Sequence, residues 1–88
     1  MSELETLRER IDQIDSSWLA LLSARFEVTR QVGELKKRQG LPARDPAREA
    51  QQTERMRQLA AEAGLAPELA ENIFKLIASA VVAEHQKP

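Results

Sequence analysis

Cysteine is absent from the 88-residue sequence, and histidine occurs only once, as His85. A chain without cysteine has no disulfide framework and no thiolate chemistry. A single histidine does not provide the ligand set of a typical zinc site, so we expect no metal site and no cofactor. Aromatic residues are also scarce, and the apolar content is mainly Leu, Ala, Ile and Val. This composition favours helices over a β-sandwich.

Two further absences exclude classes of partner. Thirteen basic residues balance fourteen acidic ones, so no excess of positive charge points to nucleic acid or an anionic membrane. The N-terminus, Met-Ser-Glu-Leu-Glu, lacks the basic and apolar regions of a signal peptide. No run approaches the roughly 20 apolar residues that a membrane span needs. We therefore expect a soluble, cytoplasmic protein that binds neither nucleic acid nor a membrane.

A heptad-like seam of apolar residues runs along the first part of the chain. Its members are spaced alternately by three and four residues: Leu4, Leu7, Ile11, Ile14, Trp18, Leu21, Val28, Val32 and Leu35. Ser2 and Glu5 form a capping-box pattern before the seam, and Gly40 provides a C-terminal stop after it. This pattern predicts one helix over about residues 3–39. Gly33, inside the helix, leaves room for close packing.

Two shorter helices are predicted in the rest of the chain. Asp45 is a good N-cap and Pro46 a good first helical residue, which predicts a second helix over about residues 46–63. Pro67 opens a third helix with a broad apolar stripe, over about residues 67–86. The predicted fold class is therefore all-α.

The lengths of the three helices do not match. At about 1.5 Å per residue, the first spans roughly 55 Å and the others about 27 Å each. Two short helices cannot cover the whole seam, and an uncovered seam would leave a stripe of Leu, Ile and Trp in water. A second copy of the chain is the simplest cover, so we expect a single domain over residues 1–88 that forms a homodimer.

Arg25 occupies a seam position, between Leu21 and Val28, where an apolar residue is expected. Burying an unpaired cation costs several kcal/mol, so Arg25 needs an anionic partner. One interpretation is an Asp or Glu on another helix. The other is a ligand carboxylate bound by the guanidinium fork.

Arg8 and Lys36 lie one place past the seam residues Leu7 and Leu35, on one flank of the helix. Each alone is typical of a solvated flanking charge. Lys36 is roughly 16 Å along the axis from Arg25, so the two side chains could reach one small molecule. Arg8 is roughly 26 Å away in the other direction, so only Arg8 of an antiparallel partner could join them. Both subunits would then build each of two equivalent pockets.

Polar residues on the two shorter helices are also candidates. Asp45 is first of all a helix cap, while Arg48 and Glu49 are either exposed first-turn charges or part of a site. His85 continues a helical row that includes Val81 and therefore faces inward. Its place near the C-terminus also allows it to cap or fray the last turn.

Four segments of the sequence resemble the all-helical chorismate mutases, over about residues 4–85. At family-like spacing these segments are 7–15 (LRERIDQID), 21–25 (LLSAR), 32–36 (VGELK) and 44–49 (RDPARE). The resemblance implies three-helix chains that form an intertwined six-helix homodimer through the long first helix.

The resemblance also implies a role for each matching residue. Arg25, together with Arg8 of the partner subunit, would bind the two substrate carboxylates. Lys36 would donate to the ether oxygen of the breaking bond. The remaining residues would line the site near the ring hydroxyl and one carboxylate: Asp45, Arg48 and Glu49.

Two positions depart from the usual family pattern. Val81 stands where many members have a serine, and His85 stands where they have a glutamine that donates to the ether oxygen. A histidine can donate that bond from a ring N–H, so we expect His85 to be catalytic and Val81 to contact the substrate.

The activity implied is the rearrangement of chorismate to prephenate, in phenylalanine and tyrosine biosynthesis. It needs no nucleophile, metal or redox centre, which is consistent with a chain that has no cysteine and one histidine. Catalysis would come from binding the reactive conformer and from donors directed at the ether oxygen. Alternatives with the same fold are an isochorismate-pyruvate lyase and a 4-amino-4-deoxychorismate mutase. A non-catalytic helical dimerisation module is an alternative of another class, and it predicts that Arg25 pairs with a protein carboxylate.

Overall fold

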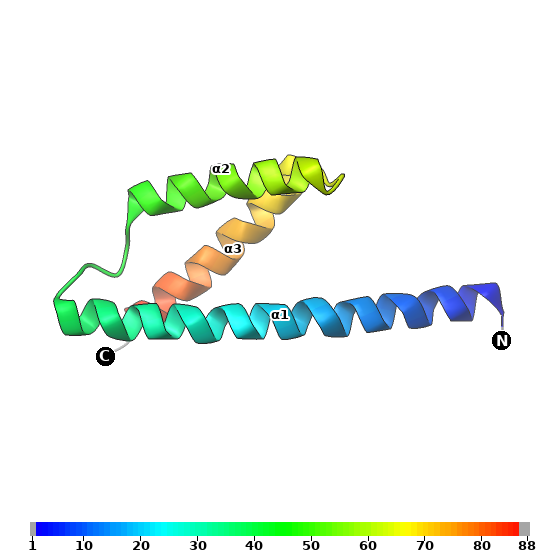
Figure 1. Cartoon of the computed structure of the whole chain (residues 1–88), viewed down its shortest axis with the longest axis horizontal. Coiled ribbons are helices and arrows are strands. Elements are labelled where there is room, and N and C mark those ends of the chain that lie inside the picture. Colours follow the sequence, from blue (N-terminus) through cyan, green and yellow to red (C-terminus); the bar gives the residue numbers. More distant parts are fainter. Residues whose placement is uncertain (1, 87–88) are drawn as a thin grey trace.

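The computed structural model describes residues 2–86, which form three helices and no strand (Figure 1). They are α1 (Glu3–Gln39), α2 (Pro46–Glu62) and α3 (Pro67–His85). The predicted all-α class is confirmed, and the predicted helix bounds agree to within one residue at each end. None of these helices is long and apolar enough to cross a membrane.

Local capping explains where α1 begins and ends. The Ser2 hydroxyl oxygen accepts a hydrogen bond from the main-chain N–H of Glu5 at 3.1 Å. Gly40 ends the helix in the left-handed conformation, with φ of 68°, and its N–H is directed at the carbonyls of Lys36 and Lys37. A side chain at Gly40 would be strained at this φ, so the glycine serves as the predicted stop.

The shorter helices begin at the predicted prolines. The Asp45 carboxylate accepts a hydrogen bond from the main-chain N–H of Arg48 at 3.1 Å, and Pro46 is the first residue of α2. Pro67 is the first residue of α3, which has no side-chain cap at Ala66. A tight turn through Gly64, with φ of 77°, joins the two helices.

The helix α3 packs against both other helices, whereas α1 and α2 do not pack directly against each other. Figure 1 shows α2 and α3 meeting near the turn between them, while the far end of α3 approaches the C-terminal half of α1. The N-terminal half of α1 extends beyond the other helices, and the chain measures 57 Å along its longest axis.

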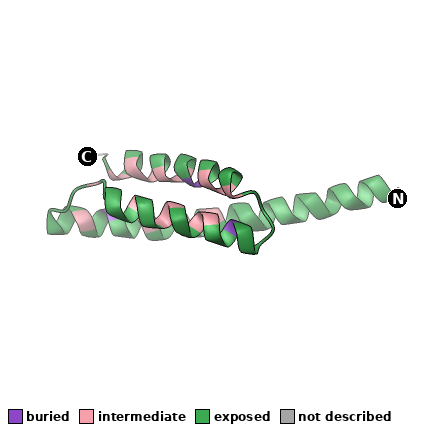
Figure 2. Ribbon diagram, turned by 90° about the horizontal axis from the view of Figure 1, so that it is seen from above, coloured by how far each residue is buried: buried purple, intermediate pink, exposed green. Residues whose placement is uncertain are grey.

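Little of the chain is buried within a single copy (Figure 2). Only Phe74 and Ala60, with 4% and 3% of their surfaces exposed, form a buried apolar core in residues 2–86, and Gly33 is also buried. The residues of α1 that are at least partly buried lie between positions 22 and 36: Leu22, Arg25, Phe26, Thr29, Gly33 and Lys36. These residues form the face of α1 that packs on α3.

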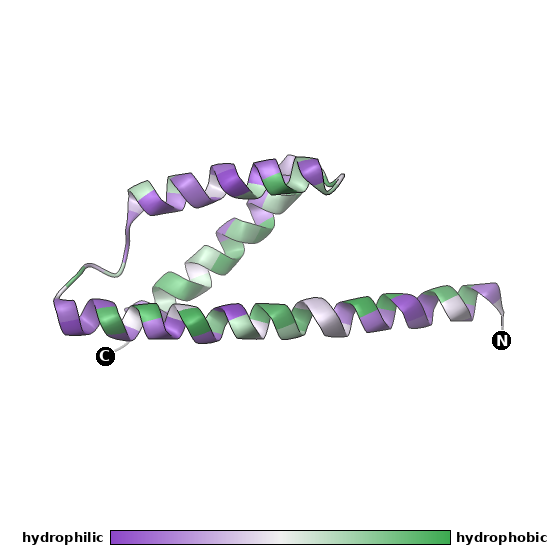
Figure 3. Cartoon of the chain, in the orientation of Figure 1, coloured by the Kyte–Doolittle hydropathy of each residue, from purple (hydrophilic) through white to green (hydrophobic). Residues whose placement is uncertain are grey.

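The heptad-like seam lies on a different face of α1. Every seam residue from Leu4 to Leu35 is exposed, by 40–72% of its surface. The seam and the packed stripe are offset by about one residue, which is a rotation of about 100° around the helix. Figure 3 shows hydrophobic positions recurring along α1 and a largely hydrophobic α3. Thus α3 packs beside the seam rather than on it, and the seam residues in the C-terminal half of α1 also stay at least 40% exposed.

Candidate functional site

A cleft of about 320 Å³ lies between the C-terminal half of α1, the start of α2 and the end of α3. This volume is within the range of small-molecule sites. Seven of the eight predicted site residues line it: Arg25, Lys36, Asp45, Arg48, Glu49, Val81 and His85. The structure therefore brings together residues that are up to 60 positions apart in sequence (25 to 85).

Arg8 is the predicted site residue that the structure keeps away from the cleft. It is exposed near the N-terminal end of α1. Seventeen residues of helix separate it from Arg25, or roughly 26 Å. Within one chain Arg8 cannot reach the cleft, as predicted from the sequence.

Three cations line the cleft without a carboxylate partner. Lys36 directs its ammonium group at the main-chain oxygen of Ala43, 3.3 Å away. The guanidinium carbon of Arg25 lies 5.7 Å from the centroid of the Phe74 ring, which is within the range of a cation–π contact. Within residues 2–86, no ion pair joins Arg25, Lys36 or Arg48 to an acidic side chain.

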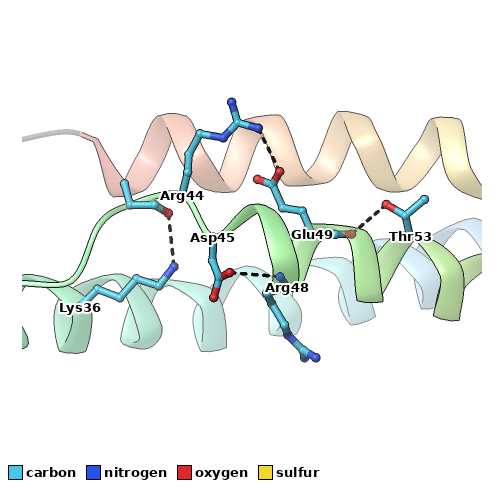
Figure 4. Close-up of polar contacts among 7 residues, drawn as sticks. Lys36, Arg44, Asp45, Arg48, Glu49 and Thr53 are labelled. Atoms are coloured by element: carbon cyan, nitrogen blue, oxygen red, sulfur yellow. Dashed lines mark hydrogen bonds and ion pairs between the residues drawn. The ribbon is translucent and has the colours of Figure 1, made fainter.

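The two carboxylates of the cleft are already engaged (Figure 4). Asp45 caps α2, and Glu49 forms an ion pair with Arg44 at 3.0 Å. Figure 4 shows Arg44 and Glu49 on the α3 side of α2, while the Arg48 side chain extends toward α1. Since the acidic groups are engaged within the chain and the three cations have no carboxylate partner among residues 2–86, the cleft is suited to a ligand with more than one negative charge.

The structure settles two local questions about α3. His85 is the last residue of α3, and its Nε2 atom lies 2.8 Å from the main-chain oxygen of Thr29 on α1. Val81 is partly buried and lines the cleft. Gly33 makes the predicted close contact, since a Cβ atom there would lie 2.5 Å from Cδ2 of His85.

Sequence reasoning missed two polar residues at the cleft, Thr29 and Gln52. Gln52 follows Arg48 by four residues and Glu49 by three, so helical periodicity could have placed it on the same face. Thr29 contributes its main-chain oxygen to His85, and no side-chain pattern predicts such a contact.

A larger hollow of about 580 Å³ lies on the outer side of α2 and α3, between Arg44, Thr53, Lys75 and Ser79. It shares Glu49, Phe74, Ala78 and Val82 with the cleft but lacks the three cations. Its own cations, Arg44 and Lys75, are paired with Glu49 and Glu71. The smaller cleft is therefore the better candidate for recognition of an anion. Among residues 2–86, no group of three His, Cys, Asp or Glu side chains could hold a metal ion.

Residues 7–86 match the model of the family described as chorismate mutase type II. The chain belongs to this family. A chorismate mutase of Methanocaldococcus jannaschii is 31% identical over 77 residues, which cover 88% of this chain and 78% of that protein.

Other relatives of this chorismate mutase type II chain are much longer. The T-protein of Enterobacter agglomerans is 39% identical over 77 residues, covering 88% of this chain but 21% of the T-protein. The bifunctional chorismate mutase/prephenate dehydratase of Aquifex aeolicus is 36% identical over 90 residues, covering 99% of this chain and 25% of that protein. The chain thus spans about a fifth to a quarter of the length of these two relatives.

Proposed function

We propose that this protein is an isomerase that converts chorismate to prephenate, in phenylalanine and tyrosine biosynthesis. The observation that carries the proposal is the set of three cations in one cleft, Arg25, Lys36 and Arg48, with no carboxylate partner in residues 2–86. Chorismate is a dicarboxylate, and such a cleft would bind it through charge-assisted hydrogen bonds. Membership of the chorismate mutase type II family supports the same reaction.

The reaction is a concerted rearrangement in which one C–O bond breaks while one C–C bond forms. The protein must therefore hold the compact conformer in which the two reacting carbons are close. Arg25, together with Arg8 of the partner subunit, would bind the two substrate carboxylates, and Arg48, on another helix, would lie near one of them. Negative charge grows on the ether oxygen in the transition state, and Lys36 is the cation that would donate to it.

Asp45 and Glu49 would lie beside the ring hydroxyl, and Val81 would form an apolar wall of the cleft. The Arg44–Glu49 ion pair would hold Glu49 in a fixed orientation as the ligand binds. The prediction that His85 donates to the ether oxygen stays a prediction, and the contacts of its ring are taken up below.

We further propose that the active form is an intertwined six-helix homodimer. The exposed seam from Leu4 to Leu35 supports this, because a second copy would cover its apolar side chains. An antiparallel partner would also bring its own Arg8 to the cleft. Each cleft would then gain a fourth cation, and two equivalent sites would each use both subunits.

The test is an assay of the purified protein with chorismate and, separately, with isochorismate. We expect prephenate from chorismate, with no salicylate or pyruvate from isochorismate. Salicylate and pyruvate from isochorismate would instead identify an isochorismate-pyruvate lyase, and turnover of 4-amino-4-deoxychorismate alone would identify the corresponding mutase. No turnover and no binding of any of the three would favour the non-catalytic dimerisation module.

A further inference from the structure

The single histidine makes a contact that restricts its chemistry. The Nε2 atom of His85 is 2.8 Å from the main-chain oxygen of Thr29. A carbonyl oxygen only accepts hydrogen bonds, so Nε2 must carry the hydrogen and donate it to Thr29. A neutral imidazole has one N–H, and this contact uses it.

The second ring nitrogen is not available to a ligand either. The Nδ1 atom of His85 is buried and has no hydrogen-bond partner among the described residues. The ring lines the cleft, but its Nε2 atom is hydrogen-bonded to the main chain of α1 and its Nδ1 atom is buried. To donate to a bound ether oxygen, the ring would have to leave this position.

Gly33 explains why the ring can lie so close to α1. A Cβ atom at Gly33 would be 2.5 Å from Cδ2 and 2.9 Å from Nε2 of His85. Contacts this short do not occur, so any side chain at position 33 would displace the ring. Thr29 is one turn before Gly33 on the same face of α1. The imidazole, the Thr29 oxygen and the bare main chain of Gly33 therefore form one packed unit.

We propose that His85 is a positioning residue that locks the end of α3 onto α1, and that Lys36 rather than His85 is the donor to the ether oxygen. The second half of this proposal rests on the proposed function. The end of α3 carries Val81 and Val82, which both line the cleft. By holding this end against Gly33, His85 sets the position of the apolar wall against which the substrate is bound.

The first experiment observes the ring directly. Because the chain has one histidine, protein labelled with ¹⁵N-histidine gives an unambiguous nitrogen–proton correlation spectrum. We expect the Nε2–H form in the free protein, and ring nitrogen shifts that stay essentially unchanged when prephenate saturates the site. An Nδ1–H form, or a new hydrogen bond from the ring to bound prephenate, would overturn the proposal.

The second experiment is a double-mutant cycle on thermal unfolding, with Gly33→Ala, His85→Ala and the double variant. Gly33→Ala should lower the unfolding temperature of the parent because the new methyl group displaces the ring. In the His85→Ala background the same change should be neutral or stabilising, because the space is free and Ala favours a helix over Gly. Equal effects in both backgrounds would contradict the packed unit. This cycle needs no substrate, so it stands even if chorismate is not turned over and the proposed function fails.

The third experiment separates positioning from donation by kinetics with chorismate. His85→Ala should raise KM by at least as large a factor as it lowers kcat, together with a loss of stability. A fall in kcat of about a hundredfold with KM and unfolding temperature unchanged would instead identify His85 as the donor.

His85→Gln is the matched control, since its amide N–H can still donate to Thr29. The charged residues around the ring are unchanged in this variant: Arg25, Lys36, Asp45, Arg48 and Glu49. Its pH–rate profile should superpose on that of the parent between about pH 5 and 8, where an unperturbed histidine titrates. A flattened profile would mean that the reaction uses the His85 proton.

Discussion

The two halves of α1 share one apolar periodicity but have opposite surroundings. From residue 3 to 21 every side chain is exposed, whereas six residues between 22 and 36 are partly or fully buried, on the face toward α3. Helices in water obtain most of their stability from packing of an apolar face rather than from intrinsic propensity. The N-terminal half obtains no such packing within one chain, which supports the proposed homodimer.

The comparison also separates two functions of the same helix. The C-terminal half contributes Arg25 and Lys36 to a cleft formed within the chain. The N-terminal half carries Arg8, which would serve only a cleft of another copy. In the proposed dimer, assembly and catalysis would depend on each other.

The largest effect on assembly and activity should follow from disrupting the apolar seam in the N-terminal half of α1. Replacing Ile11 and Ile14 with glutamate would place charges in the proposed dimer interface, so the chain should dissociate and largely unfold at micromolar concentration. Sedimentation and far-UV circular dichroism would measure both effects, and activity should fall by at least about a hundredfold because the shared site is lost. The control is Ser16→Glu, which adds one charge on the opposite side of the same half. A folded, active monomer of the double variant would contradict the comparison.

The shared site is tested by complementation between the two halves. Arg8→Ala and Arg25→Ala homodimers should each lose roughly a hundredfold in activity, because a desolvated charge pair is worth about 3 kcal/mol. A heterodimer of the two variants has one intact site and one site that lacks both arginines. Mixing under subunit exchange should therefore restore up to about half the parental activity per heterodimer. No recovery despite proven exchange would place both arginines in a site within one chain, or in none.

Lys36 tests the chemistry of the C-terminal half alone. Lys36→Ala should lower kcat by about a hundredfold with a much smaller change in KM, because the donor acts mainly on the transition state. The matched control is Arg38→Ala, which removes a nearby exposed cation of the same last turn and should leave kcat unchanged. Equal effects of the two substitutions would show that only the general positive charge of this region matters.

Two substitutions of Asp45 can distinguish its role as the N-cap of α2 from its proposed role in substrate binding. Asp45→Ala should destabilise the protein by about 1 kcal/mol in urea unfolding because the N-cap is lost. Asp45→Asn keeps the capping oxygen, so it should restore stability while altering kcat/KM for chorismate if the carboxylate contacts the ring hydroxyl. Full activity of Asp45→Asn would show that Asp45 acts only as a helix cap.

The smallest effect concerns the contact between α2 and α3, away from the cleft. The hydrogen bond and the charge of Lys75, together with Arg57, hold the pKa of Glu71 below its ordinary value of 4.5. A lowered pKa contributes stability above pH 4.5 that is lost as pH falls through the folded-state pKa. Glu71→Gln should therefore cause a small, salt-sensitive loss of stability at pH 7 and none at pH 2. An equal loss at both values would mean that the charge of Glu71 is irrelevant.

Local sequence signals were sufficient to predict the secondary structure. Ser2, Asp45 and Pro67 marked helix starts and Gly40 a helix end, because caps and prolines act through the nearest main-chain groups. The heptad-like seam was equally readable, since the spacing of apolar residues depends only on helix geometry. The identity of the cleft residues came from family-like spacing along the sequence, and the structure places seven of the eight around one cleft.

Contacts between distant residues needed the tertiary structure. The chain sequence determined three helices, an uncovered apolar seam and an Arg8 too far from Arg25 to share a site within one chain. Only the tertiary structure decided that α3 packs beside the seam rather than on it, since a rotation of one residue about α1 leaves the sequence pattern unchanged. The same packing brought His85 against the Thr29 oxygen and Gly33. The sequence could not predict these contacts, because main-chain acceptors and the space beside a glycine leave no side-chain pattern.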